Sequence, residues 1–219
     1  MNFSVIFDMD GILVDSEPMW RLAEMETFKL IGVNLTDEMC HQTKGMRMDM
    51  VVDYWYKEAP DPSYPKTQFM QKLKTRVTEL VEKTSEPMPG VIKLIETLKE
   101  NHILMGLCSS SPMDLIEANI EKFGIKQYLT YYHSTENEIY AKPHPVGYLT
   151  TAKTMKVNPT NCIVFEDSVT GAIAGKAATM KVIAIPSENE RDSRFDFCDL
   201  MLNSMTEVSL SLLENLAKQ

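Results

Sequence analysis

The 219-residue sequence has few cysteines, no run of basic residues and no long apolar segment. Its four cysteines, at positions 40, 108, 162 and 198, lie far apart and form no Cys-x-x-Cys pair, which is typical of a reducing compartment and not of a disulfide scaffold. No apolar run approaches the roughly 20 residues that a membrane-spanning helix requires. The segment Met1–Phe7 lacks the positive region and the long apolar stretch of a signal peptide. We therefore expect a cytoplasmic protein without a membrane partner.

The charge balance argues against a further class of partner. The chain carries 22 basic and 31 acidic side chains, a formal net charge of −9. A nucleic-acid-binding protein normally presents a basic patch, so we expect no nucleic-acid partner. An acidic protein that handles an anion needs a local device, such as a metal ion or a helix N-terminus.

Short apolar segments alternate with longer amphipathic segments over most of the chain. The apolar segments predict strands at Ser4–Phe7, Ile103–Cys108, Tyr128–Tyr132, Cys162–Phe165, Val182–Ile185 and Leu200–Leu202. The amphipathic segments predict helices at Val91–Glu100, Met113–Phe123, Pro145–Met155, Val169–Ala177 and Val208–Leu216. Nearly continuous apolar character is typical of parallel strands that are covered on both faces. The pattern therefore predicts an α/β fold with a Rossmann-like open parallel sheet.

One region breaks this alternation. From about residue 17 to residue 86 we find no strand pattern, and the periodicity predicts three or four helices, among them Arg21–Ile31, Met48–Tyr56 and Phe69–Val81. The segment Glu86–Gly90 carries prolines, which cannot continue a helix, and resembles a linker. We expect a core domain of residues 1–15 and 87–219, with a helical cap domain of residues 16–86 inserted after the first strand.

Acidic side chains follow two of the predicted strands. Asp8 and Asp10 come after the first strand, where the carboxyl edge of a parallel sheet forms a ligand-binding crevice. A tight turn after Asp10 is the alternative reading, and it leaves Asp8 unexplained. Glu166 and Asp167 follow the fourth predicted strand. Helix capping by Asp167 is the alternative there, and it leaves Glu166 unexplained.

Hydroxyl groups and a lysine occupy two more strand–helix junctions. Ser109 and Ser110 precede a predicted helix, whose free N–H groups would suit an anion, although a plain helix cap is the alternative. Lys142, beside a proline, would neutralise a phosphate, although most lysines are simply solvated. Carboxylates from two strands suit Mg²⁺, and an aspartate can act as a covalent nucleophile. Together the four junctions predict a magnesium-dependent site for a phosphate ester.

The order of these motifs resembles that of the haloacid dehalogenase superfamily over nearly the whole chain. The matching motifs are Phe7–Gly11, Leu107–Ser109, Ala141–Pro143 and Glu166–Ser168. The helical insertion is similar to the family's mobile cap. Within the superfamily the chain is similar to the β-phosphoglucomutase-like branch. Two segments, Gly45–Tyr56 and Asp15–Trp20, look most like those of bacterial 2-deoxyglucose-6-phosphatases and hexitol phosphatases.

The resemblance implies a Mg²⁺-dependent phosphatase that acts on a small sugar or sugar-alcohol phosphate, such as 2-deoxyglucose 6-phosphate. Asp8 would be the nucleophile that forms an aspartyl-phosphate, and Asp10 would act first as general acid and then as general base. Asp8, the backbone carbonyl of Asp10 and Asp167 would bind Mg²⁺, with Glu166 in an outer shell or bound through water. The partner would be a small phosphorylated metabolite, and we expect a monomer.

The remaining roles concern the phosphate and the cap. Ser109, backbone amides near Ser110, and Lys142 would hold the phosphoryl oxygens. Gly45, Met46 and Arg47 are the cap residues expected to reach the sugar, and a solvated helix-start arginine is the alternative for Arg47.

Trp20 helps to choose between two functions of the branch. Mutases of the branch usually place a histidine at the cap hinge, where this sequence has Trp20. This favours a phosphatase and leaves a phosphosugar mutase as the alternative. A non-catalytic relative that binds a partner through the cap is a further alternative, against which the four intact motifs argue.

Overall fold

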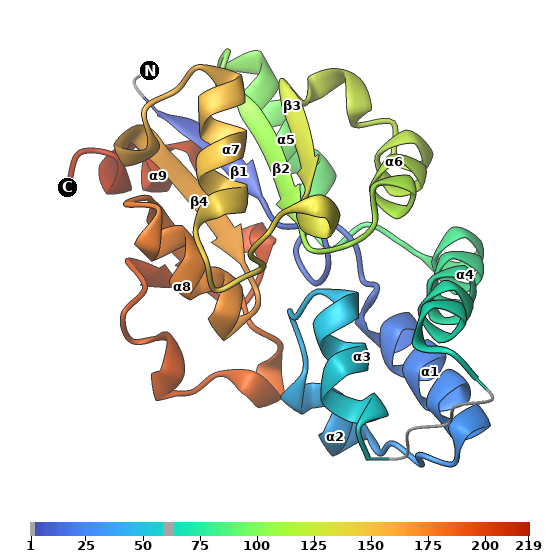
Figure 1. The fold of residues 1–219 in the computed structure, drawn as a ribbon. Coiled ribbons are helices and arrows are strands. Elements are labelled where there is room, and N and C mark those ends of the chain that lie inside the picture. Colours follow the sequence, from blue (N-terminus) through green and yellow to red (C-terminus); the bar gives the residue numbers. More distant parts are fainter. Residues whose placement is uncertain (1–2, 59–63) are drawn as a thin grey trace.

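A parallel sheet lies at the centre of the molecule. The computed structural model describes residues 3–58 and 64–219, and within them the sheet has six strands in the order β3-β2-β1-β4-β5-β6 (Figure 1). The strands are β1 (Ser4–Phe7), β2 (Met105–Ser109), β3 (Tyr131–Ser134), β4 (Cys162–Glu166), β5 (Lys181–Ala184) and β6 (Leu200–Met201). Every neighbouring pair is parallel. The predicted α/β fold with a Rossmann-like open parallel sheet is confirmed.

The strand order places the site. The chain runs outward from β1 through β2 to β3, and then from β4 outward to β6 on the other side, so the direction of winding reverses between β1 and β4. In register, Phe7 lies opposite Leu107 of β2 and Phe165 of β4. The residues that follow these three strands therefore emerge at one edge. In open α/β sheets this reversal point is where ligands bind.

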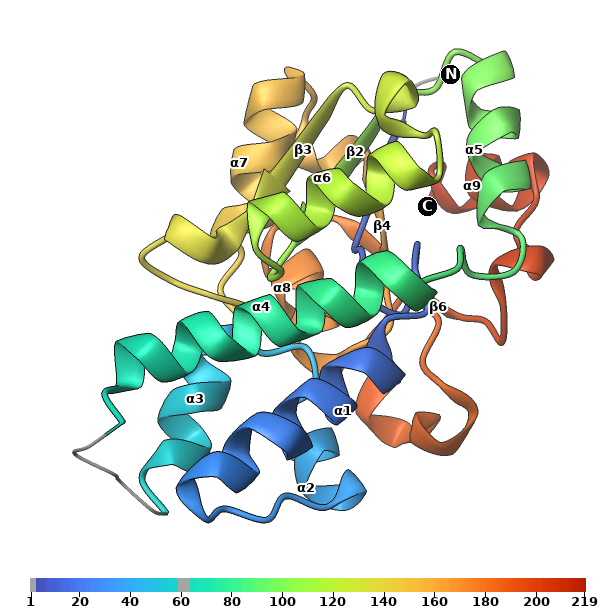
Figure 2. The same cartoon turned by 90° about the vertical axis from the view of Figure 1, so that its right-hand side faces the viewer.

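Helices cover both faces of the sheet (Figure 1, Figure 2). One face packs against α7 (Val146–Met155) and α8 (Val169–Ala177), and the other against α5 (Val91–Glu100), α6 (Met113–Lys122) and α9 (Leu210–Leu216). Successive side chains of a strand point to opposite faces. Accordingly, Ile6 packs in the apolar cluster on the side of α7 and α8, whereas Val5 and Phe7 pack in the cluster on the side of α5, α6 and α9.

A helical cap lies beyond the carboxyl edge of the sheet (Figure 1, Figure 2). It consists of α1 (Glu17–Phe28), α2 (Asp37–Gln42), α3 (Met48–Tyr56) and α4 (Lys66–Thr84). Buried residues recur every four positions along α4, at Phe69, Leu73, Val77 and Val81. The ring of Phe69 meets that of Phe28 edge-on, with centroids 4.7 Å apart. The cap thus has its own apolar interior.

The two connections between cap and core run side by side. The Asp15 N–H donates to the Glu86 carbonyl over 3.1 Å, and the Met88 N–H donates to the Leu13 carbonyl over 3.0 Å. These contacts lie next to the domain boundaries expected at 15/16 and 86/87, and the division into two domains stays a prediction. Among the described helices, none combines the length and the apolar character that crossing a bilayer requires.

Most differences between predicted and observed elements concern their ends. α1 begins at Glu17, four residues before the predicted start, because Pro18 suits the first turn of a helix. β3 begins at Tyr131, later than predicted, because Lys126–Tyr128 form a short 3₁₀ turn. Helix α2 is stabilised at its start by Thr36, whose Oγ1 accepts from the Met39 N–H.

Candidate active site

A buried ionic cluster joins the ends of β1 and β4. The Lys142 Nζ lies 2.8 Å from Asp8 Oδ1 and 2.5 Å from Glu166 Oε1. The Tyr148 hydroxyl donates to the same Glu166 oxygen over 2.5 Å. Lys142 is 3% exposed and Glu166 is fully buried. A buried charge is tolerated only when it is paired and hydrogen-bonded, so these contacts hold Lys142 beside Asp8.

The charges of this cluster do not cancel. Burial raises the pKa of Asp8 well above its ordinary value, Glu166, Asp167 and Asp10 raise it further, and Lys142 opposes the shift. Burial alone would lower the pKa of Lys142, but Asp8 and Glu166 raise it above its usual range. Lys142 therefore stays charged. An ionised Asp8 needs more positive charge nearby than this lysine supplies.

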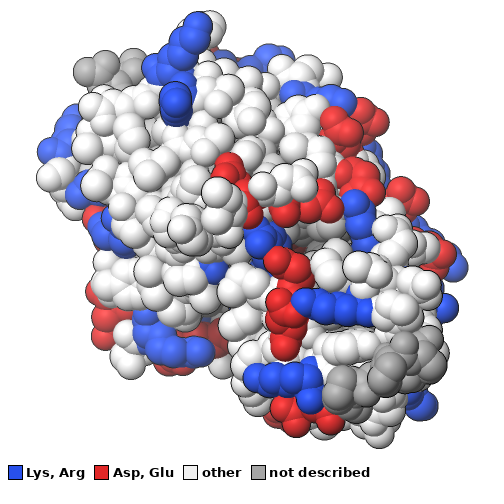
Figure 3. Space-filling model, in the orientation of Figure 1, with Lys and Arg blue, Asp and Glu red and all other residues white. Residues whose placement is uncertain are grey.

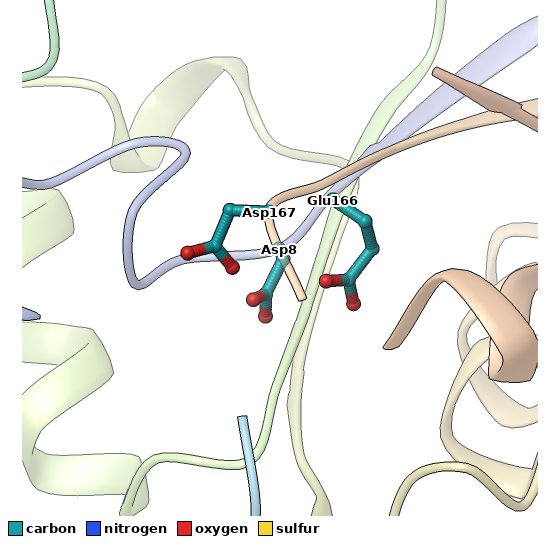
Figure 4. Close-up of side chains that lie close together, drawn as sticks. All are labelled: Asp8, Glu166 and Asp167. Carbon is teal, nitrogen blue, oxygen red and sulfur yellow. The ribbon is translucent and has the colours of Figure 1, made fainter. Parts of the chain in front are cut away.

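Three carboxylates of the site suit a divalent metal. Asp8, Glu166 and Asp167 each offer an oxygen, and these oxygens lie within 4.8 Å of one another. Figure 4 shows the three side chains close together, with the Asp8 carboxylate between those of Asp167 and Glu166 in this view. Carboxylate oxygens are the donors that hard cations such as Mg²⁺ prefer. The residues therefore fit the predicted metal, whose charge would add to those of Lys142 beside Asp8 and Lys44 beside Asp167.

Glu166 differs from the other two carboxylates. Its Oε1 accepts from Lys142 and Tyr148, and its Oε2 accepts from the Ser168 hydroxyl over 3.1 Å and the Ser168 N–H over 3.4 Å. Both oxygens thus have protein donors. Such a carboxylate is suited to orienting the residues around a metal.

Donors from core and cap surround the carboxylate of Asp10. Ser111 Oγ donates to its Oδ2 over 2.6 Å, and Ser109 Oγ lies 3.4 Å from the same oxygen. Ser16 Oγ and, over 3.1 Å, Trp20 Nε1 donate to Oδ1. Asp10 lines the cavity between core and cap. It is therefore fixed at a point where both parts of the molecule meet.

The turn after Asp10 requires a glycine for two reasons. Gly11 has a φ of +72°, which favours glycine. A Cβ atom at this position would lie 2.2 Å from Asp167 Oδ2. The Asp10-Gly11 turn is therefore present, and it also brings the first motif against the fourth.

The serine loop after β2 offers hydroxyl groups to the cavity. Ser109 is fully buried, and its Oγ accepts from the Ser111 N–H over 3.0 Å. Within the described parts of the chain, Ser110 Oγ is buried and has no hydrogen-bond partner. Ser109 and Ser110 both line the cavity. An unpaired buried hydroxyl is uncommon in proteins, and a bound anion would satisfy it.

The cap brings three of the four predicted cap residues to the cavity. Trp20, Gly45 and Met46 line it, and its free volume is about 50 Å³. This space accommodates a few water molecules and no sugar phosphate, so the cap has to move for a substrate to enter. Gly45 has a φ of +74°, and a Cβ there would lie 2.6 Å from the Ser168 side chain. The missing side chain lets the cap approach the core.

Arg47 is the predicted cap residue that the structure does not bring into the cavity. Its guanidinium donates to the carbonyl oxygens of Thr135 over 2.9 Å and of Glu138 over 2.7 Å, both in the core. It also pairs with Asp49 over 2.7 Å. In this conformation Arg47 joins the cap to the core.

Four residues that the sequence analysis did not select also contribute to the site. Lys44 lies 2.8 Å from Asp167 Oδ2 and 2.5 Å from Glu190 Oε2. Its position next to Gly45 was a usable signal. Ser111, two residues after Ser109, had the spacing of a second strand-end hydroxyl. Tyr148 and Glu24 carried no such signal, because each is placed by the packing of its helix.

Two acid pairs, a serine loop and a buried lysine meet at the strand ends of an α/β sheet, and a helical cap covers them. This arrangement is typical of one class of hydrolases. The chain belongs to the haloacid dehalogenase-like hydrolases, a family that matches residues 5–185. The predicted family is therefore confirmed.

Among its relatives, hexitol phosphatase B of Escherichia coli (strain K12) is 39% identical over 209 residues, 94% of each chain. Among the solved structures that share the fold, two illustrate the similarity. The β-phosphoglucomutase of Clostridium difficile has a TM-score of 0.87 at 21% identity and covers 100% of this chain and 98% of its own. CbbY of Rhodobacter sphaeroides, in complex with phosphate, has a TM-score of 0.88 at 24% identity and covers 98% and 100%.

These similarities confirm part of what the sequence predicts. The chain is a phosphoric monoester hydrolase of the haloacid dehalogenase type. The family and its phosphatase-named relatives imply a small phosphorylated substrate. The buried acidic cluster is compatible with a divalent metal. The roles of individual residues stay predictions.

Proposed function

We propose that the protein is a Mg²⁺-dependent phosphatase that hydrolyses a small sugar or sugar-alcohol phosphate through an aspartyl-phosphate. The observation that carries this proposal is the position of Asp8. Its carboxylate pairs with Lys142, and the residue lines the cavity between core and cap. The 39% identity to a hexitol phosphatase supports a sugar-alcohol phosphate or a related hexose 6-phosphate, such as 2-deoxyglucose 6-phosphate.

The residues of the site have distinct roles in this proposal. An oxygen of Asp8 bonds to phosphorus as the bond to the sugar oxygen breaks, and Asp10 gives its proton to that oxygen. Asp10 then takes a proton from the water that hydrolyses the aspartyl-phosphate. Ser109, the Ser110 region and Lys142 hold the phosphoryl oxygens.

A metal would be held by Asp8, Asp167 and the Asp10 carbonyl, with Glu166 as an orienting residue. When bound, Mg²⁺ supplies the positive charge that keeps Asp8 ionised and offsets the charge of the phosphate. The hydrogen bonds from Lys142 and from Tyr148 support the orienting role of Glu166, because both occupy its Oε1.

The hinge residue supports a phosphatase over a mutase. Trp20 donates its N–H to Asp10 over 3.1 Å. An indole has one donor and cannot accept or relay a proton as histidine does. A mutase must protect the aspartyl-phosphate from water until a bisphosphate has turned round, whereas a phosphatase needs only water and a base. A phosphosugar mutase is the second candidate, because the β-phosphoglucomutase structure shares this fold.

A time course separates the two functions. The enzyme is incubated with Mg²⁺ and, in turn, 2-deoxyglucose 6-phosphate, sorbitol 6-phosphate and β-glucose 1-phosphate, and free phosphate and glucose 6-phosphate are both followed. We expect phosphate release from the 6-phosphates and no isomerisation of β-glucose 1-phosphate. Rapid formation of glucose 6-phosphate with little free phosphate would establish the mutase.

Turnover of p-nitrophenyl phosphate tests a different alternative, the non-catalytic relative. Mg²⁺-dependent release of p-nitrophenol is expected, and its absence would favour a protein that binds a partner through the cap. The cytoplasmic location, the monomeric state and the lack of nucleic-acid and membrane partners stay predictions from the sequence.

A further inference from the structure

One face of helix α1 forms a wall of the cavity. Glu17, Trp20, Arg21 and Glu24 all line it, at spacings of three and four residues. Side chains at these spacings share one face of a helix. Trp20 contacts Asp10, so this face begins at the reacting groups and leads away from them into the cap.

Glu24 is the least expected residue on this face. It is 7% exposed, and in the described part of the chain its Oε2 has no hydrogen-bond partner. Burial raises its pKa from 4.5 to about 7, against the opposing effects of Cys40 and Arg21. Buried carboxylates are normally paired, because an unpaired one costs stability. A structural role alone does not require a free oxygen at this place.

The position of Glu24 suits the part of a substrate that leaves. It lies four residues, or about 6 Å of helix rise, beyond Trp20. Asp10, which Trp20 contacts, is the residue proposed to protonate the leaving oxygen. A chain of carbon atoms attached to that oxygen and directed into the cap would therefore pass Glu24. The cavity wall around it includes apolar side chains, among them Met48, Val51 and Leu73.

We propose that Glu24 is a specificity-determining residue whose free carboxylate oxygen accepts a hydrogen bond from a hydroxyl group on the polyol or sugar part of the substrate. This inference rests on the proposed function and adds to it a reason for preferring hydroxylated alcohols. A site with a buried, unpaired acceptor discriminates strongly against analogues that lack the matching hydroxyl. Esters without hydroxyl groups gain nothing from Glu24.

The test compares two substrates in three variants. Sorbitol 6-phosphate carries hydroxyl groups along its chain, and p-nitrophenyl phosphate carries none. Glu24→Leu removes the acceptor, and Glu24→Gln keeps the shape but not the charge. Glu26→Gln is the matched control, since Glu26 lies on the same helix, is exposed and pairs with Arg76 within the cap over 2.6 Å.

We expect Glu24→Leu to lower kcat/KM for sorbitol 6-phosphate by about 10- to 100-fold and that for p-nitrophenyl phosphate by less than about threefold. Glu24→Gln should give a smaller loss in the same direction, and Glu26→Gln should change neither value. The thermal midpoint of Glu24→Leu should not fall below that of the wild type, because the substitution removes a buried carboxylate whose Oε2 has no hydrogen-bond partner within the described residues.

Each other result has a separate meaning. Equal losses on both substrates, with a lower thermal midpoint, would show that Glu24 is structural and overturn the inference. An unchanged ratio of kcat/KM for the two substrates in Glu24→Leu would also overturn the inference. If the wild type still hydrolysed sorbitol 6-phosphate, the proposed function would stand. A wild type that cleaves p-nitrophenyl phosphate but neither sorbitol 6-phosphate nor 2-deoxyglucose 6-phosphate would overturn the proposed sugar-phosphate substrate and the inference with it.

Discussion

The core and the cap line one cavity in opposite ways. On the core side the charged groups are paired, as Lys142 is with Asp8 and Glu166. On the cap side, helix α1 presents Glu24, whose Oε2 has no hydrogen-bond partner within residues 3–58 and 64–219. Paired groups hold one geometry, which suits a chemical step that is the same for every substrate. A free group is available to the part of the substrate that varies. We infer that reaction and selectivity are divided between the two parts.

The contacts between cap and core differ from those within each part. Lys74 of the cap lies 3.2 Å from both Asp114 and Glu136 of the core, and Arg47 donates to two core carbonyls. On the face shown in Figure 3, acidic and basic side chains are interspersed along the junction of core and cap. Exposed ion pairs contribute little stability. The cap can separate from the core with the interior of each part still packed, although the buried pairs of Lys44 with Asp167 and Glu190 then have to break.

Breaking the core side should have the largest effect. Asp8→Asn should lower kcat by about 1,000-fold or more with every substrate, because an amide does not attack phosphorus at a useful rate. Steady-state kinetics with sorbitol 6-phosphate and p-nitrophenyl phosphate checks this. The variant should stay folded, as judged by circular dichroism, since no apolar packing is lost. Activity near that of the wild type would show that another residue is the nucleophile.

Removing the metal should be nearly as damaging. Excess chelator should abolish turnover, and added Mg²⁺ should restore it. Mg²⁺ should also raise the thermal midpoint of the wild type by a few degrees, because a bound cation relieves the repulsion among Asp8, Glu166 and Asp167. Asp167→Asn is the control, in which the shift should shrink. A midpoint that ignores Mg²⁺ at millimolar concentration would contradict the proposed metal site.

The core side was largely predictable from the sequence, for a topological reason. Asp8 and Glu166 follow apolar strands directly, and parallel strands bring their carboxyl ends to one edge whatever the details of packing. The same rule located Ser109. The sequence could not show that Tyr148 reaches Glu166, because that contact depends on how α7 sits against the sheet.

The cap side was much less predictable. The helical periodicity of α1 is visible in the sequence. Which face of this helix lines the cavity depends on how the helix packs against α4 and the core. Glu24 therefore gave no signal in the sequence. Arg47 was expected at the sugar, and its guanidinium instead lies on the carbonyls of Thr135 and Glu138, 88 and 91 residues further along the chain. The partners of a long polar side chain such as Arg47 depend on which distant residues the tertiary structure brings near it.

A single added methyl group at Gly45 should prevent the cap from closing on the core. Gly45→Ala should lower kcat/KM by roughly tenfold or more, because the new Cβ would meet the Ser168 side chain at 2.6 Å and hold the cap away from the core. Gly32→Ala is the matched control. Gly32 also has a positive φ, of +83°, but a Cβ there meets nothing within 4 Å. Gly32→Ala should have a similar backbone strain from the positive φ and should keep its activity. Equal losses in both variants would assign the effect to backbone strain.

The pH dependence of stability tests the environment of Glu24 on the cap side of the cavity. The pKa of Glu24 is about 7 in the folded protein against 4.5 for a free side chain. The folded state binds the carboxyl proton of Glu24 more tightly than the unfolded state does. Its contribution to the free energy of unfolding is therefore complete below pH 4.5 and is lost as pH rises through 7. Arg21 and Cys40 face the carboxyl and oppose the shift only in part.

The measurement is the free energy of unfolding of the wild type and of Glu24→Gln from pH 4.5 to pH 8. The wild type should lose up to about 3 kcal/mol relative to the variant over this range. Other buried carboxyl groups titrate in both proteins and cancel in the difference. A difference that stays constant with pH would mean that Glu24 titrates normally, as a solvated or paired carboxylate would.

The smallest effect should come from the ionic contacts of the junction. Lys74→Met removes the pairs with Asp114 and Glu136, and Arg76→Met removes a pair with Glu26 that lies within the cap. Lys74→Met should lose less than about 1 kcal/mol of stability in urea denaturation, because its side chain is partly exposed, and Arg76→Met should lose little because Arg76 is more exposed. Only Lys74→Met should change KM for sorbitol 6-phosphate, by less than about threefold, since only its pairs favour the closed cap. A tenfold change would show that ionic contacts hold the cap closed, and identical behaviour of the two variants would show that Lys74 does not act on the junction.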